Sequence, residues 1–146
     1  MTSAAGWRRW EERFDDAVRL VRERRLGEAL DAIHGLRTWQ HRGRYDHGDH
    51  TWHDAELLWL RGLALERARR GRKALDAWGQ LADVLIKERR NGSWVLPICS
   101  VCASRQLRFG DNWHSVAKAV HPVAGDRAFI IAYLQARARG CTGSDA

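Results

Sequence analysis

The sequence predicts an all-α fold of antiparallel helical hairpins that stack on one another. Apolar residues recur at spacings of three and four along most of the chain, which is the pattern of helices with one buried face. Short polar breaks separate these periodic segments, and helices joined so tightly must run antiparallel. The length of 146 residues suits one domain with a single core. We expect about six to seven helices.

The first hairpin is predicted over residues 7–38. Its opening helix directs one apolar stripe toward the core, formed by Trp7, Trp10, Phe14, Ala17 and Val21. A break near residues 25–27 precedes a second stripe, which contains Leu26, Ala29, Leu30, Ile33 and Leu36.

The second hairpin is predicted over residues 52–88, after an exposed loop at 40–51. The loop has no apolar periodicity, carries two glycines and mixes His, Arg and Asp. The first helix of this hairpin is apolar on more than one face, so we expect it to be the most buried helix. Its partner ends at basic residues that suit the negative end of the helix dipole, followed by the stop signal Asn91-Gly92.

A third hairpin is predicted over residues 94–139. Pro97 is compatible with the first turn of its opening helix. Proline has no backbone N–H, and a first-turn N–H would have no carbonyl acceptor within the helix. The last helix is expected over 126–139, followed by a flexible tail at 140–146. The chain is therefore expected to form a single domain over residues 1–139.

The first two hairpins share a register that resembles the tetratricopeptide repeat. In the second hairpin the matching positions are Gly62, Leu65, Ala74 and Trp78; in the first they are Ala17, Leu20, Ala29 and Ile33. Small residues at such positions let two helices approach closely, and the larger ones fill the groove between hairpins. The resemblance covers about the first 90 residues and implies a right-handed array of hairpins.

The resemblance implies a protein-interaction adaptor or scaffold. Its concave groove, lined mainly by the first helix of each hairpin, would receive a peptide or a partner protein. Candidate groove residues are Arg13, Trp59 and Arg61, and the arginine content points to an acidic partner. The alternative is that Trp59 belongs to the core and that the arginines form a solvated face.

Net charge makes nucleic-acid binding the main competing function. The chain has 25 basic and 18 acidic residues, and nearly all of the basic ones are arginine. Arginine clusters at 8–9, 22–25, 67–72 and 89–90 are interleaved with tryptophans that could stack on bases. Several clusters coincide with predicted helix ends, however, where arginine also satisfies terminal carbonyl groups.

A zinc-binding helical protein is the second alternative. His47, His50 and His53 recur at three-residue intervals, and Cys99 with Cys102 forms a Cys-Ser-Val-Cys pair, so together they offer enough ligands for one ion. The competing interpretation is a solvated histidine loop and two cysteines that act as small apolar residues in a helix. On that interpretation the protein has no cofactor.

No catalytic constellation stands out, and we expect no enzyme activity. The three cysteines cannot all pair within one chain, which favours a reducing compartment over secretion. We find no signal-peptide core and no stretch that could span a bilayer, so a cytoplasmic protein is expected. The exposed end of a helical stack could also be covered by a second copy, as a homodimer.

Overall fold

The computed structural model describes residues 3–41, 51–89, 99–101 and 126–143, and within these ranges the protein is helical apart from the hairpin turns and the short segment 99–101. The helices are α1 (Ser3–Arg22), α2 (Leu26–His41), α3 (Thr51–Arg67), α4 (Gly71–Arg89) and α6 (Asp126–Gly143). The described residues include no strand. The predicted all-α class is therefore confirmed for this part of the chain.

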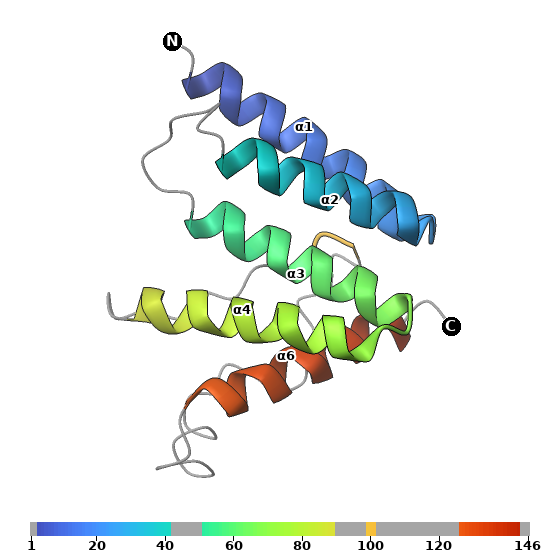
Figure 1. The fold of residues 1–146 in the computed structure, drawn as a ribbon, viewed down its shortest axis with the longest axis vertical. Coiled ribbons are helices and arrows are strands. Elements are labelled where there is room, and N and C mark those ends of the chain that lie inside the picture. Colours follow the sequence, from blue (N-terminus) through green and yellow to red (C-terminus); the bar gives the residue numbers. More distant parts are fainter. Residues whose placement is uncertain (1–2, 42–50, 90–98, 102–125, 144–146) are drawn as a thin grey trace.

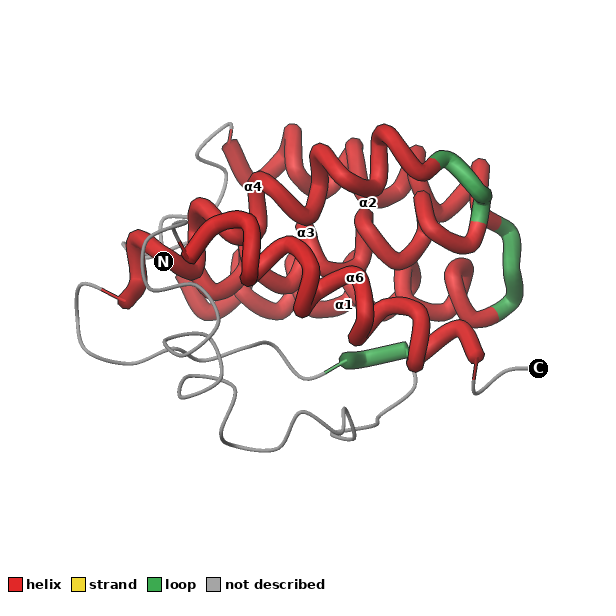
Figure 2. Tube along the Cα trace, turned by 90° about the horizontal axis from the view of Figure 1, so that it is seen from below, coloured by secondary structure: helices red, strands yellow, loops and turns green. Residues whose placement is uncertain are grey.

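Two antiparallel hairpins, α1/α2 and α3/α4, lie next to each other in chain order (Figure 1). Helix α2 packs on α3, and α6 covers α4 and part of α3. Figure 2 shows the same helices from a perpendicular direction, with both hairpin turns, in green, on the same side. Of the loop predicted at 40–51, residues 40 and 41 instead belong to α2 and residue 51 to α3, while 42–50 lie outside the described residues, as does the short segment at 113–120. Of the opening helix predicted after Ser93, only 99–101 are described, and they are not helical. Helix α6 begins where expected but continues to Gly143, past the predicted end at 139.

The turn of the first hairpin is closed by backbone hydrogen bonds. The amide of Arg25 donates to the carbonyl of Leu20 at 2.9 Å, and the amide of Arg24 donates to that of Val21 at 3.1 Å. Arg24 has a φ of 60°. This bond pattern around one left-handed residue is the Schellman motif, which satisfies carbonyl groups at a helix C-terminus.

The second hairpin turns in the same way. The amide of Arg70 donates to the carbonyl of Leu65 at 2.9 Å, and the amide of Arg69 donates to the backbone carbonyl of Glu66 at 3.0 Å. Arg69 has a φ of 59°. These residues occupy the positions equivalent to those of the first turn in the register predicted from the sequence. The two hairpins therefore repeat the same local structure.

The core is centred on α3, as its sequence predicted. Its apolar residues Leu57 to Leu60 and Leu63 to Leu65 are buried around the helix rather than along one stripe. This follows from its position, because α3 packs against α1, α2, α4 and α6. A helix surrounded by other helices needs apolar side chains on several faces.

Gly62 on α3 lies directly against Trp78 on α4. A Cβ atom at this position would overlap the six-membered ring of Trp78. Trp78 is fully buried, its indole Nε1 donates to Glu66 Oε1 at 3.1 Å, and its ring lies 5.1 Å from that of Trp59. The small residue and the large aromatic of the predicted register are thus in direct contact.

Gly62→Ala is expected to lower the free energy of unfolding by about 1–3 kcal/mol, because the new methyl group must displace a buried indole. The measurement is equilibrium denaturation in urea. Gly35→Ala is the matched control, since Gly35 lies inside α2 and a Cβ atom there would meet no other group within 4 Å. That change should raise stability by roughly 0.5–1 kcal/mol. Equal effects of the two substitutions would contradict the close packing of α3 on α4.

Arg69→Gly is expected to raise the free energy of unfolding by about 0.5–1 kcal/mol, because glycine adopts a positive φ without strain. Arg72→Gly, in the first turn of α4, serves as the control and should lower stability by a similar amount. Thermal denaturation of both variants beside the wild type measures the difference. A destabilised Arg69→Gly would argue against the left-handed turn.

Candidate functional site

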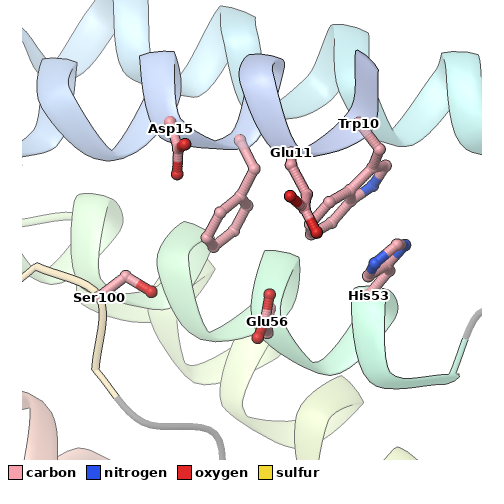
Figure 3. Close-up of a pocket in the computed structure, with 7 residues that line it drawn as sticks. Trp10, Glu11, Asp15, His53, Glu56 and Ser100 are labelled. Atoms are coloured by element: carbon pink, nitrogen blue, oxygen red, sulfur yellow. The ribbon is translucent and has the colours of Figure 1, made fainter. Parts of the chain in front are cut away.

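A pocket of about 330 Å³ opens between α1 and α3, the first helices of the two hairpins. Its lining residues come from α1, α3 and the described segment 99–101: Trp10, Glu11, Phe14, Asp15, His53, Glu56 and Ser100. Figure 3 shows the α1 side chains on one side of the opening and His53 and Glu56 on the other. Four of its lining residues lie on α1 and two on α3.

One wall of the pocket is aromatic. The imidazole of His53 stacks on the indole of Trp10, with ring centroids 3.6 Å apart and an interplanar angle of 5°. Phe14 also stacks with Trp10, at a centroid distance of 4.9 Å and an angle of 11°. Trp10 and His53 are buried to 2% and 3% exposure, so the wall is held in place by packing.

A chain of two hydrogen bonds, the first buried and the second partly buried, fixes the orientation of Trp10. Its indole Nε1 donates to Gln40 Oε1 at 2.9 Å, and Gln40 Nε2 donates to Asp54 Oδ1 at 2.5 Å. Since Gln40 is on α2 and Asp54 on α3, the chain ties three helices together beside the pocket. Buried polar groups that are satisfied in this way favour one arrangement of the surrounding helices.

The other side of the pocket is acidic. Glu11, Asp15 and Glu56 supply three carboxylates, and none of the described lining residues is a lysine or arginine. Ser100 completes the lining, and its backbone carbonyl accepts a hydrogen bond from Arg22 Nη2 at the end of α1. The pocket therefore combines aromatic surface with negative charge, which suits a cation attached to an apolar stem.

The groove residues expected from the sequence do not line this pocket. The guanidinium of Arg13 lies 5.2 Å from the ring centroid of Trp39 on α2, and Arg61 is half-buried on α3. Trp59 is only 2% exposed, between Trp78 and the guanidinium of Arg137, which lies 5.1 Å from its ring. This position corresponds to the alternative in which Trp59 is a core residue.

The proposed zinc ligands fall only partly within the described residues. His47, His50 and Cys102 lie outside them, whereas His53 stacks on Trp10. The sulfur of Cys99 lies 3.5 Å from that of Cys141 on α6. Within the described ranges, no group of three His, Cys, Asp or Glu side chains is arranged to hold a metal ion.

The predicted arginine clusters at 22–25 and 67–72 lie on the same side of the molecule, because both hairpin turns lie there (Figures 1 and 2). The exposed basic residues there are Arg24, Arg25, Arg69, Arg70, Arg72 and Lys73, which we call the basic turn surface. Arg25 is paired with Glu28 at 2.5 Å. The basic turn surface and the acidic pocket thus present opposite charge.

Comparison with protein-family models, curated proteins and solved structures finds no match for this chain. Among the described helices, none is both long and apolar enough to cross a membrane.

The sequence interpretation assigned no functional role to any of Glu11, Asp15, Gln40, Glu56 and Ser100. The spacing of Glu11 and Asp15, one helical turn apart beside Phe14, was the available signal. It indicates that two carboxylates and an aromatic ring share one region of the helix surface. Nothing in that spacing shows that α3 brings a third carboxylate to the same place.

Proposed function

We propose that this protein is an interaction module of stacked helical hairpins, similar to tetratricopeptide repeats, that binds a segment of a partner protein between α1 and α3. The pocket between these helices is the observation that carries the proposal. Its position on the first helix of each hairpin matches the groove implied by the resemblance. The repeated turn geometry of the two hairpins supports the same architecture.

The pocket lining favours a basic side chain from the partner, rather than the acidic one suggested by overall composition. An arginine or lysine stem could pack along Phe14 and the edge of Trp10 while its charge approaches Glu11, Asp15 and Glu56. Carboxylates on two different helices could then contact one guanidinium. The proposal assigns no catalytic step to these residues.

Peptide selection tests this function directly. A phage-displayed library of random linear peptides, selected on the wild-type protein, should yield sequences that share an arginine or lysine next to an apolar residue. Synthetic versions of these peptides should lose about tenfold in affinity for Asp15→Lys, because the variant replaces attraction by repulsion. Asp15 is exposed, so this change should leave the fold intact. Isothermal titration calorimetry measures the affinities.

Asp76→Lys is the matched control, because it makes the same charge change at an exposed site on α4 that does not line the pocket. The affinity of Asp76→Lys for the selected peptides should equal that of the wild type at moderate ionic strength, where distant charges are screened. Selected peptides that are acidic, or that bind Asp15→Lys and wild type equally, would overturn the assignment of the pocket.

Nucleic-acid binding is the second candidate function, and the basic turn surface is the observation that favours it. Fluorescence anisotropy with a labelled single-stranded RNA would test it. If RNA binds through Arg70 and Arg72, the variant carrying Arg70→Glu and Arg72→Glu should bind it more weakly. The slope of log K against log salt concentration should become shallower by roughly 0.7 for each lost phosphate contact. Lys87→Glu, at the opposite end of α4, is the control for charge. The same salt dependence in all variants would exclude this surface.

A further inference from the structure

Two cysteines that are far apart in the sequence meet in the core. The sulfurs of Cys99, in the segment 99–101, and Cys141, on α6, lie 3.5 Å apart. Both residues are buried, with exposures of 1% and 5%. The sequence interpretation paired Cys99 with Cys102 and placed Cys141 in a flexible tail. Helix α6 instead extends past residue 139 and brings Cys141 to Cys99.

A guanidinium accompanies this cysteine pair. Arg67 Nη2, at the end of α3, lies 4.0 Å from the sulfur of Cys141. Its Nη1 donates to the carbonyl of Val21 at 3.2 Å, which holds the side chain across the ends of α1 and α3. A positive charge beside a sulfur atom stabilises the thiolate, which is the nucleophilic form of cysteine.

The segment that carries Cys99 is also fixed from α1. Arg22 donates from Nε to the carbonyl of Val101 at 3.0 Å and from Nη2 to the carbonyl of Ser100. These bonds hold the backbone on the C-terminal side of Cys99. Cys99 thus adjoins held backbone and Cys141 lies in helix α6, with their sulfurs close enough that side-chain rotation could bring them to the disulfide length of about 2.05 Å.

We infer that Cys99 and Cys141 form a reversible disulfide when the protein meets a peroxide. The Cys141 thiolate attacks one oxygen of hydrogen peroxide, so that an S–O bond forms, the O–O bond breaks, and the leaving oxygen takes a proton to become water. Cys99 sulfur then attacks the Cys141 sulfenic sulfur. The S–S bond forms, the S–O bond breaks, and the departing hydroxide leaves as water with the Cys99 proton. Two thiols are oxidised and one peroxide is reduced.

The bond would link α6 covalently to the segment 99–101 across a sequence separation of 42 residues. Closing a long loop lowers the entropy of the unfolded chain, so the oxidised protein should be the more stable form. Ser100, the neighbour of Cys99, lines the pocket. The disulfide would therefore also hold one wall of the proposed binding site.

Mass spectrometry of the full chain tests the inference. After treatment with hydrogen peroxide, the intact protein should lose the mass of two hydrogen atoms and recover it with dithiothreitol. Trypsin cleaves after Arg90, Arg105 and Arg139, so a non-reduced digest should contain peptide 91–105 joined to peptide 140–146. The melting temperature of the oxidised form should rise by about 5–10 °C.

Peptide 91–105 contains both Cys99 and Cys102, so a cross-link to Cys141 could involve either of them. The Cys102→Ser variant leaves Cys99 as the only possible partner in that peptide. This variant should form the cross-link in full, whereas Cys99→Ala and Cys141→Ala should each abolish it. Arg67→Gln should slow its formation about tenfold, since the thiolate loses its neighbouring charge. A Cys99–Cys102 bond, a gain of oxygen without a cross-link, or no reaction would each overturn the inference.

Discussion

The contact between Gly62 and Trp78 is the constraint on which the rest of the structure depends. Because glycine leaves room for the indole, α4 can lie directly against α3. Helix α6 then packs on α4 and α3 together, so its position follows from how closely those two helices approach. The other side of α3 faces α1 and forms the pocket. A change of spacing between α3 and α4 would consequently be transmitted to α6 and to the environment of Cys141.

The two hairpins share the same backbone conformation at their turns, but side chains at equivalent positions make different contacts. Arg22 and Arg67 occupy equivalent positions, each as the last residue of the first helix of its hairpin. Arg22 binds the carbonyls of the segment 99–101, whereas Arg67 reaches Val21 and Cys141. The ends of α1 and α3 are thus connected to other parts of the chain by long cationic side chains. Arginine is suited to this role because its several donors can reach separate acceptors.

The sequence predicted local structure well because helix faces and turns are encoded by neighbouring residues. The stripes containing Ala17 and Ala29 and the buried character of α3 follow from periodicity. Residue size indicated that Gly62 allows a close helix approach, but not that Trp78 is the side chain it contacts. The meeting of Cys99 with Cys141 could not be predicted in this way, since it depends on where α6 packs. The same holds for Gln40, whose bonds to Trp10 and Asp54 require three helices to be in place.

The pocket lining and the whole chain differ in the sign of their charge. The chain has a formal net charge of +7, yet the described pocket is lined by Glu11, Asp15 and Glu56. At physiological ionic strength, interactions between exposed charges fade over about 8 Å, so a ligand in the pocket responds mainly to these carboxylates. The arginines at the hairpin turns contribute instead to the long-range attraction of negatively charged molecules. A protein with a strongly basic composition can therefore present a locally acidic pocket, because the charge of a pocket depends on the few side chains that line it rather than on the sum over the chain.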